Sequence, residues 1–499
     1  MLANELITLV EDIRTKKCER QNIELKRAAL GTPEKLYDTL SSFANQTGGG
    51  IIVFGIDEKA DYQITGVYDS QDLQTKVTNQ ALQMEPVVRP VFTIAQINGK
   101  TVVSAEIAEC DIFSRPCFYK GAGRVRGSYI RVGEADMPMT EYEVYSYEAL
   151  KKQLHDELRV AERAGLEDFA SLRLNEYFVN VRRYKPNLAK LEEKRILQLQ
   201  GMAAENKPTI AGLMVLGEYP QAFFPQLSIT AIAIAGYQFG DLGRNNERFM
   251  DNQRLEGNLI EMLEGAMAFI RRNIKCATII NGQGKREDKN EYPLVAVREI
   301  ILNALIHRDY SMHTDHSPIR ILIYKDRLEV ENPGGLYGRI TLNDLGKIAA
   351  DTRNPFIATA MEALKATENR FSGIPIIRAE MEKAGLPPPQ FFNSRGVFKV
   401  VLYNGQGRQE PLPNYSVYEH GVPYGKPAKT DEPKPFEPVE AILAFCREPR
   451  SRTEIAQLLQ LDTPAYVVKK YLRPLVEAKK LRLTVPEAPK SKNQKYVTV

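Results

Sequence analysis

The sequence contains few cysteines and no long apolar run. Its five cysteines are scattered, odd in number and form no Cys-x-x-Cys pair: Cys18, Cys110, Cys117, Cys276 and Cys446. This spacing argues against a zinc finger or a disulfide framework and is typical of a reducing compartment. No segment approaches the ~18 apolar residues of a membrane span, and the N-terminus reads as an amphipathic helix with acidic residues. We therefore expect a cytoplasmic protein without a membrane partner.

Positive charge is also scarce, except at the C-terminal end. The formal net charge is only +4 over 499 residues, which excludes a polybasic nucleic-acid coat. Residues 439–499 carry twelve Lys or Arg against six Asp or Glu, so this segment has a net charge of +6 and the rest has −2. Such asymmetry indicates that the last segment is the basic module.

The length predicts about three or four domains. Pro and Gly are frequent in residues 406–438, which is typical of a linker. The predicted units are a mixed α/β domain (1–140), a helical connector (141–206), a second α/β domain (207–405), this linker, and a helical module that ends in a hairpin (439–499).

Apolar periodicity predicts the main elements. In the first domain we expect a helix around Glu34–Asn45 and strands at Gly50–Gly55, Val91–Ile97, Thr101–Ile107 and Ser128–Val132. In the second we expect strands at Thr209–Leu216 and Ser228–Ala235, helices at Gly257–Asn273 and Pro293–His307, a hairpin of Ile319–Tyr324 with Leu328–Glu331, and a strand at Val397–Tyr403.

The helix predicted at Pro293–His307 separates apolar from polar residues. Its apolar stripe is Val297, Ile300, Ile301, Ala304 and Leu305. Glu299 and Asn303 lie on the other face, one turn apart, with His307 on its flank. An amide oxygen can ligate Mg²⁺ and a carboxylate can orient a water, so this pair suits a metal-assisted phosphate site.

Glu299-x-x-x-Asn303 resembles the N-box of the GHKL-type ATPase fold, an α/β sandwich shared by gyrases, heat-shock chaperones, histidine kinases and mismatch-repair ATPases. The longer string REIILNALIHRDYS, DRLEVENPGGL, RNPFIA and GLPPPQF is similar to bacterial divergent-AAA transcriptional regulators, which are often labelled RecG-like helicases. The resemblance covers about residues 200–405. The chain lacks the Gly-x-x-x-x-Gly-Lys-Ser/Thr motif, so no motor motif supports the helicase label.

This resemblance implies ATP and Mg²⁺ as ligands. Asn303 would hold Mg²⁺, Glu299 would act as base or orient the water, and His307 would lie near the cofactor. Asn332, Gly334 and Gly335 would read adenine, and Gly373 would contact phosphate. Two departures favour the alternative of a retained fold without nucleotide: Asn332 replaces the usual Asp, and the first glycine of the Gly373 loop is missing. His307–Tyr310 form either a pocket edge or a polar helix end.

The N-terminal domain resembles the Schlafen AlbA-type domain. The resemblance rests on Glu19, Glu24, Lys26, the segment Ser41–Asp57 and the segment Arg126–Gly133. Schlafen relatives with RNase activity carry an acidic trio, which would correspond here to Glu19, Glu24 and Asp57 and would bind a divalent metal. The alternative is that Glu24 and Lys26, on the same side of a strand, form an ion pair while Asp57 is a turn residue.

Basic residues of the same domain offer phosphate contacts. Lys26, Arg124, Arg126 and Arg131 can bind a nucleic-acid backbone, the alternative being a solvated basic face.

The C-terminal module shows a winged helix-turn-helix pattern. Its third helix (Tyr466–Lys480) carries Lys469, Lys470 and Arg473, and Leu481–Val485 would pair with Lys495–Val499 as the wing, with Lys492 beside it. We expect major-groove binding with phosphate contacts from the wing. The alternative is a winged helix used for protein contacts.

Together these features predict a DNA-binding transcriptional regulator with a nucleotide-binding ATPase-like domain. Two alternatives are a metal-dependent nuclease acting on RNA or single-stranded DNA, and an ATP-hydrolysing switch. Homodimerisation is expected by analogy with such folds.

Overall fold

The structure of the protein is a computed structural model. It describes residues 1–18, 20–243, 245–280, 286–349, 351–367, 373–405, 442–443, 445–446, 449–458, 468–478, 480–487 and 494–498, with side chains excepted at 279–280, 286–288, 456–458, 469–470 and 477. The chain forms two compact units, of which the first ends at Val417 and the second begins at Tyr418. Among the described residues, no helix is both long and apolar enough to span a membrane.

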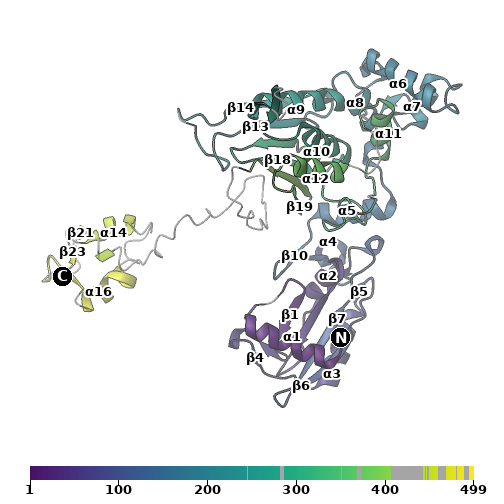
Figure 1. The fold of residues 1–499 in the computed structure, drawn as a ribbon. Helices are drawn as coiled ribbons and strands as arrows, with labels where there is room; N and C mark the ends of the chain where they lie inside the picture. The colour runs from purple at the N-terminus through teal and green to yellow at the C-terminus, as the bar shows by residue number, and fades with distance from the viewer. Residues whose placement is uncertain are drawn as a thin grey trace. The chain divides into compact units, whose positions relative to one another are not determined.

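The first 140 residues form three layers around a four-stranded sheet (Figure 1). Its order is β1-β2-β7-β6, with β1 parallel to β2 and the other pairs antiparallel. Helix α1 packs its buried face (Leu6, Val10, Ile13) on one side of the sheet, and α2 and α3 pack on the other. The bounds are α1 (Ala3–Lys16), β1 (Ile23–Lys26), α2 (Tyr37–Asn45), β2 (Gly50–Phe54), α3 (Ser70–Ala81), β6 (Val91–Ile97), β7 (Lys100–Ile107), α4 (Gly123–Gly127), β9 (Tyr129–Val132) and β10 (Ala135–Pro138).

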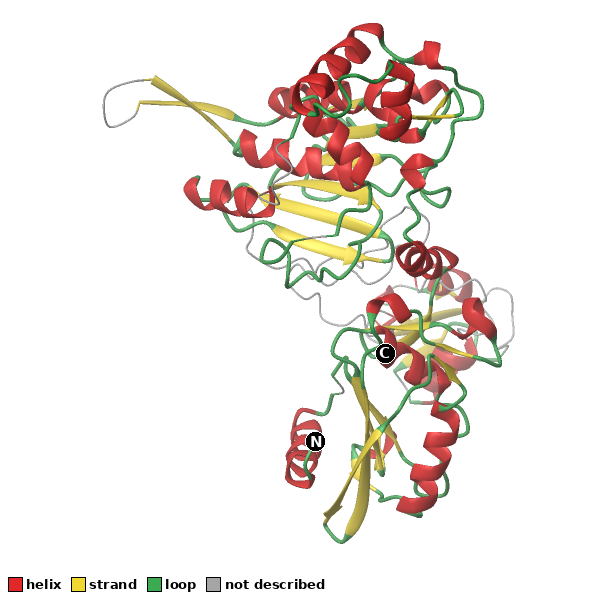
Figure 2. Cartoon of the chain, turned by 90° about the vertical axis from the view of Figure 1, so that its right-hand side faces the viewer, coloured by secondary structure: helices red, strands yellow, loops and turns green. Residues whose placement is uncertain are grey.

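The larger sheet has six strands and carries helices on one face. Its order is β14-β13-β17-β18-β20-β19, antiparallel except between β13 and β17. Helices α9, α10 and α12 cover this face, and a two-stranded ribbon of β15 and β16 extends from the domain at the upper left of Figure 2. The strands are β13 (Ile229–Ala233), β14 (Asp251–Leu255), β15 (Cys276–Ile280), β16 (Arg286–Asn290), β17 (Ile319–Ile323), β18 (Arg327–Pro333), β19 (Gln390–Ser394) and β20 (Val397–Tyr403). The helices are α9 (Leu259–Asn273), α10 (Leu294–His307), α11 (Pro355–Ala363) and α12 (Gly373–Lys383).

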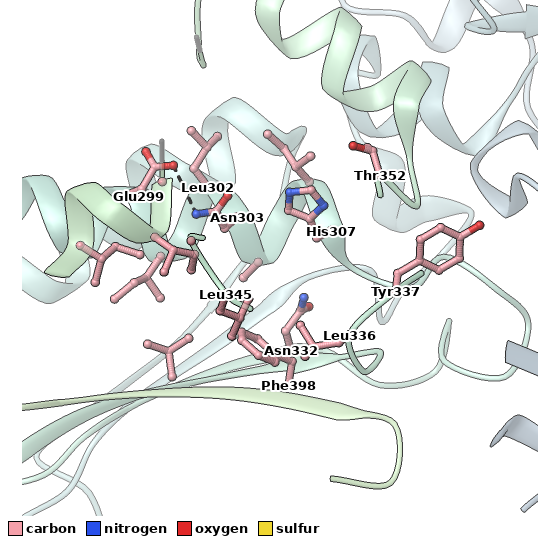
Figure 3. A pocket seen from close by; sticks show the side chains of 18 of the residues that line it. Glu299, Leu302, Asn303, His307, Asn332, Leu336, Tyr337, Leu345, Thr352 and Phe398 are labelled. Atoms are coloured by element: carbon pink, nitrogen blue, oxygen red, sulfur yellow. Dashed lines mark hydrogen bonds between the residues drawn. The ribbon is translucent and has the colours of Figure 1, made fainter. Parts of the chain in front are cut away.

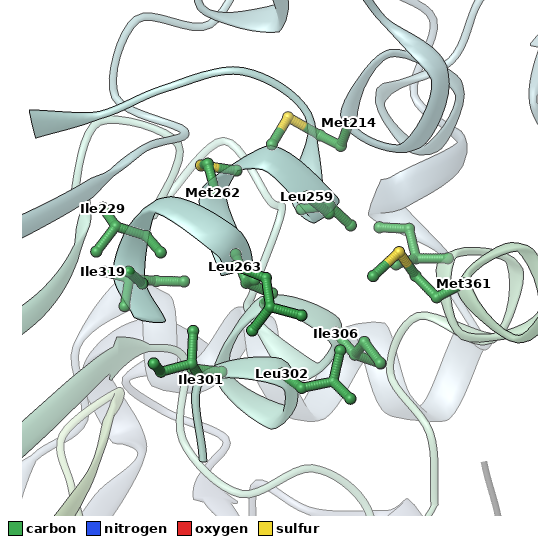
Figure 4. Packing of buried hydrophobic residues seen from close by; sticks show 14 of the residues in the cluster. Met214, Ile229, Leu259, Met262, Leu263, Ile301, Leu302, Ile306, Ile319 and Met361 are labelled. Atoms are coloured by element: carbon green, nitrogen blue, oxygen red, sulfur yellow. The ribbon is translucent and has the colours of Figure 1, made fainter. Parts of the chain in front are cut away.

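A single apolar core joins the connector to this domain. Buried residues run from Ala161 to Leu402 in one cluster, and Figure 4 shows Met214, Leu263, Ile301 and Met361 among its members. The connector elements are α5 (Glu141–Lys152), η3 (Asp156–Leu158), η4 (Leu166–Asp168), α6 (Ser171–Tyr184), α7 (Glu193–Leu199) and α8 (Ile210–Leu216). The helical content predicted for residues 141–206 is confirmed.

The prediction of a strand at Thr209–Leu216 is wrong, because Ile210–Leu216 form helix α8. All seven residues are buried, so the run shows no periodicity that separates a helix from a strand. The Thr209 hydroxyl accepts a hydrogen bond from the Gly212 N–H at 3.0 Å and caps the helix. The other strands, helices and the hairpin predicted for this domain are present. Strand β19, which was not predicted, pairs with β20 and forms the edge of the sheet.

The C-terminal unit contains a three-stranded antiparallel sheet, β21-β23-β22, built from β21 (Arg450–Ser451), β22 (Leu481–Leu483) and β23 (Lys495–Thr498). Its helices are α14 (Arg452–Leu458), η6 (Val468–Leu472) and α16 (Arg473–Glu477). The predicted pairing of the last two strands is confirmed. The predicted linker at 406–438 lies outside the described residues.

A buried carboxylate ties the connector to helix α11. Glu157 is fully buried, and its two oxygens accept the backbone N–H groups of Phe356 at 3.0 Å and Ile357 at 2.8 Å. Burial raises the pKa of this carboxyl to about 7, against the effect of the two N–H donors. The contact therefore contains a proton-binding group that titrates near neutral pH.

This shift makes stability depend on pH. Because the raised pKa means that the folded state binds the proton more tightly, the contribution of Glu157 is largest below pH ~4.5 and is lost as pH rises to about 7. We expect the free energy of unfolding of the protein, relative to its Glu157→Gln variant, to fall by about 3 kcal/mol over that range. Calorimetry across the range measures this, with the exposed Glu162→Gln as control; parallel curves for wild type and Glu157→Gln would contradict it.

Candidate functional site

A cavity of about 490 Å³ lies between helix α10, helix α12, strands β18 and β20, and the segment 336–353 (Figure 3). Its walls are mostly apolar, and include Leu302, Ile306, Val330, Leu345, Ile374 and Phe398. Its polar groups come from α10, from Asn332 near the end of β18, and from the segments 351–353 and 365–367. A concave site lined by apolar side chains together with convergent polar groups is the usual form of a small-molecule site.

Glu299, Asn303 and Gly373 meet at one end of the cavity. The Asn303 amide donates a hydrogen bond to Glu299 Oε1 at 3.2 Å, and burial raises the pKa of the Glu299 carboxyl. Gly373 is the first residue of α12, and a Cβ there would lie 2.4 Å from Glu299 Oε1 and 2.7 Å from Asn303 Nδ2. A larger residue at this position would therefore displace the ends of these two side chains. Phe371 and Ser372, where the predicted phosphate loop begins, lie outside the described residues.

His307 extends into the cavity one turn beyond Asn303, as Figure 3 shows. Its side chain lines this space and is exposed. Enclosure, and then the nearby Arg353, lower the pKa of His307 to about 4. The imidazole is therefore neutral at pH 7 and can accept as well as donate a hydrogen bond.

The segment His307–Tyr310 combines both predicted roles. His307 lines the cavity, whereas the next three residues are buried in structural contacts. Arg308 donates to the Thr314 carbonyl at 3.1 Å, and Tyr310 donates to the Leu305 carbonyl at 2.8 Å.

Asn332 points into the middle of the cavity from the end of β18 (Figure 3). It is 5% exposed, and its Oδ1 has no hydrogen-bond partner among the described residues. Because buried polar atoms are normally paired, this amide is a group to which a bound ligand can hydrogen-bond. The following turn has Gly334 at φ +107°, where a Cβ would lie 2.6 Å from Arg353 Nη1 and 2.7 Å from Asp309 Cβ. Gly335 also lines the cavity.

Sequence reasoning missed Arg353, which lines the cavity near Tyr337 and Thr352. Its Nη1 lies 2.6 Å from Asp309 Oδ2, its Nη2 donates to the Gly335 carbonyl at 3.1 Å, and its guanidinium lies 5.2 Å from the centre of the Tyr337 ring. The only sequence signal was the motif Arg353-Asn354-Pro355 at a helix start, which indicates no role for the arginine.

The acidic residues of the N-terminal domain are separately engaged. Glu24 pairs with Lys26 at 2.5 Å and with Arg131 at 2.8 Å. Asp57 accepts the Lys59 N–H at 3.1 Å, and it pairs with Arg27 at 3.4 Å. Glu19 lies outside the described residues. No group of three or more His, Cys, Asp or Glu suited to a metal ion occurs in the part of the chain that the structure describes.

The basic residues of this domain fall into two classes. Arg131 is buried between Glu24 and Asp136, at 2.8 and 2.9 Å, so its predicted phosphate contact is corrected to a structural ion pair. Arg124 and Arg126 lie on the short helix α4 and not on a strand. Arg124 pairs with Glu148, whereas Arg126 is exposed. Arg126 is therefore the more available of the two for a phosphate.

In the C-terminal unit, Lys469 and Lys470 lie in η6, and Arg473 is exposed at the start of α16. Lys492 lies outside the described residues.

Comparison with known families agrees with this geometry. Residues 316–402 match the family profile described as "Putative ATP-dependent DNA helicase recG C-terminal", and residues 19–140 match "Schlafen, AlbA_2". The chain carries an AlbA_2 domain and a RecG-type ATPase-like domain. Residues 437–498 match "Filamentation induced by cAMP protein Fic-like, C-terminal domain". No curated protein matches the chain.

Solved structures that are similar to the chain include the following two. The crystal structure of the DIP2311 protein from Corynebacterium diphtheriae is 20% identical, with 99% of this chain and 97% of that chain covered and a TM-score of 0.38. The solution structure of the N-terminal domain of a putative ATP-dependent DNA helicase RecG-related protein from Nitrosomonas europaea is 27% identical, with 26% and 90% covered and a TM-score of 0.22. Both TM-scores lie below 0.5, so neither likeness assigns a fold or a function.

Glu299, Asn303 and the turn after Asn332 all line one cavity. The AlbA_2 domain holds Glu24 and Asp57 in separate ion pairs. The role of each of these residues stays a prediction.

The two arginines of the AlbA_2 domain should differ in their effect on stability. Arg131→Ala leaves Glu24 and Asp136 without their shared buried cation, so we expect a loss of about 3–5 kcal/mol in the free energy of unfolding. Arg126→Ala removes an exposed side chain and should change stability by less than about 0.5 kcal/mol. Calorimetry of the full chain distinguishes them, and equal stability of the two variants would refute the buried role of Arg131.

Proposed function

We propose that the protein is a DNA-binding transcriptional regulator whose ATPase-like domain binds a nucleotide. The observation that carries the nucleotide is the convergence of Glu299, Asn303, His307 and Asn332 on one cavity with apolar walls. The AlbA_2 match and the basic C-terminal unit support the nucleic-acid partner. We place the protein in the cytoplasm, as a homodimer.

The cavity offers a distinct contact for each part of a nucleotide. Its apolar side chains would enclose the base, and the unpaired Asn332 amide would hydrogen-bond to the edge of that base. Asn303 would contribute one oxygen to Mg²⁺, which commonly takes few protein ligands and completes its shell with phosphates and water. The amide of Asn332, unlike the usual carboxylate, offers both a donor and an acceptor.

Hydrolysis places a further demand on Glu299. A general base must be deprotonated, and burial raises the pKa of this carboxyl. A bound Mg²⁺ would favour the charged carboxylate, so the ligand itself would activate the base. Binding without hydrolysis needs only Asn303, Asn332 and the cavity walls, and we therefore propose nucleotide binding as the primary activity, with an ATP-hydrolysing switch as its extension.

The C-terminal unit is proposed as a winged helix that contacts DNA. Two features support this proposal. Strands β22 and β23, which follow helix α16 in the sequence, form an antiparallel pair, and residues 439–499 carry a net charge of +6. We propose that residues 406–438 are the linker that connects it to the ATPase-like domain.

Nucleotide binding is tested by ligand-dependent thermal stability. A ligand at about 100 times its Kd, binding only the folded state, raises the free energy of unfolding by about 2.7 kcal/mol. We expect Mg²⁺-ATP to stabilise the wild type and Asn175→Ala, an exposed Asn of helix α6, and to have no effect on Asn303→Ala. If millimolar Mg²⁺-ATP leaves the wild-type transition unmoved, the proposal is wrong.

DNA binding is tested by its salt dependence. Replacement of Lys469, Lys470 and Arg473 by Ala should lower duplex affinity and reduce the slope of log K against log salt by up to about 0.9 for each lost phosphate contact. The matched control removes three exposed charges from the connector, Lys190, Lys194 and Arg195. Fluorescence anisotropy at several salt concentrations measures both, and identical slopes for the two triple variants would exclude the C-terminal contact.

A further inference from the structure

Arg353 connects the cavity to a buried carboxylate outside it. The guanidinium lines the cavity and donates from Nη2 to the carbonyl of Gly335, in the turn that follows Asn332. Its Nη1 lies 2.6 Å from Asp309 Oδ2. Its Nε is buried and has no hydrogen-bond partner among the described residues, so the side chain keeps an unused donor beside the cavity.

Asp309 receives a second contact from the connector. The Tyr142 hydroxyl donates a hydrogen bond to Asp309 Oδ2 at 2.6 Å, and the Ser311 N–H donates to Oδ1 at 2.8 Å. Asp309 is 4% exposed, and Arg353 together with these donors holds its pKa below the ordinary value although burial opposes this. One carboxylate oxygen is therefore shared by a cation from the cavity and a hydroxyl from helix α5.

Tyr142 also contacts the glycine turn by a second route. Gly396 packs against the Tyr142 ring so closely that a Cβ would lie 2.4 Å from its Cε1. The Gly396 carbonyl accepts the N–H of Gly334 at 2.7 Å. Tyr142 thus reaches the turn through Asp309 and Arg353 on one side and through Gly396 on the other.

We propose that Tyr142 couples helix α5 to the occupancy of the cavity. A ligand that accepts a hydrogen bond from Arg353 changes the partner of Asp309, and hence the strength of its bond to Tyr142. Such coupling is reciprocal, so a change at Tyr142 must alter the glycine turn as much as a ligand alters α5. Helix α5 starts at Glu141, directly after the AlbA_2 domain, and is the first element that a signal from the cavity reaches along the chain.

Helix α5 supplies its own control residue. The Tyr145 hydroxyl lies 2.7 and 2.8 Å from the two oxygens of Asp156, so it also donates to a carboxylate, as Tyr142 does to Asp309. Neither Tyr145 nor Asp156 lines the cavity. The variants Tyr142→Phe and Tyr145→Phe each remove one hydroxyl and keep the ring, so a general loss of helix stability would affect the turn equally in both.

The first test uses amide hydrogen exchange of the full chain without ligand. A hydrogen bond to a charged group contributes about 1.5–3 kcal/mol, which corresponds to at least about a tenfold change in an opening equilibrium. We expect exchange at Gly334–Leu336 to rise about tenfold in Tyr142→Phe and by less than about twofold in Tyr145→Phe. Equal rates in the turn for both variants would overturn the coupling.

The second test adds Mg²⁺-ATP and rests on the proposed function. In the wild type we expect slower amide exchange at Asn332–Leu336 and a changed exchange rate in residues 141–152. In Tyr142→Phe we expect the turn to stay protected while the change in residues 141–152 is lost. Protection of the turn without any change in α5 would overturn the coupling and leave nucleotide binding intact. If ATP protects neither, the proposed function fails, and the ligand-free comparison still decides the coupling.

Discussion

The extensive apolar burial of helix α10 is the constraint on which the site depends. Eight of its fourteen residues are buried, and beyond Arg298 at its start it keeps polar side chains only at Glu299, Asn303 and His307. These three positions are four residues apart, so they lie along one line of the helix. A polar side chain in such a helix must reach either a buried partner or a space that admits a ligand, because an unpaired buried polar group is costly. The cavity lies along this line of the helix and is lined by all three polar side chains.

The remainder of the site follows from the strand opposite. Strand β18 runs beneath α10 and ends at Pro333, which brings Asn332 and the glycine turn to face His307. The turn approaches Asp309 and Arg353 closely enough that a side chain at Gly334 would collide with them. Glycine at this position therefore permits the ion pair of Asp309 and Arg353 to pack against the turn, and the ion pair in turn fixes the carbonyl of Gly335.

The sequence was sufficient to predict an element wherever its residue pattern is compatible with only one type of secondary structure. The spacing of Glu299, Asn303 and the apolar stripe admits only a helix with two faces, and the alternation around Lys325–Arg327 admits only a hairpin. It was insufficient where the partner is distant in the chain. Nothing near Arg131 indicates that Glu24 and Asp136 enclose it, and nothing near Arg353 indicates Asp309. The run Ile210–Leu216 failed for a different reason, because a fully buried segment has no periodicity to distinguish helix from strand.

The connector belongs physically to the ATPase-like domain. Its apolar residues from Ala161 onward lie in the same core as strands β13 to β20, and its polar residues add buried contacts at both ends of the segment that carries Arg353. Glu157 accepts the first N–H groups of α11, three and four residues after Arg353, and Tyr142 shares Asp309 with Arg353 itself. A ligand that displaces this segment must therefore strain two contacts with the connector. One is the contact of the Glu157 carboxyl with α11, and the other is the contact of Tyr142 with the ion pair of Asp309 and Arg353. Because both contacts involve buried charged groups, each contact has few alternative geometries. We therefore expect this segment to switch between discrete conformations and not to shift gradually.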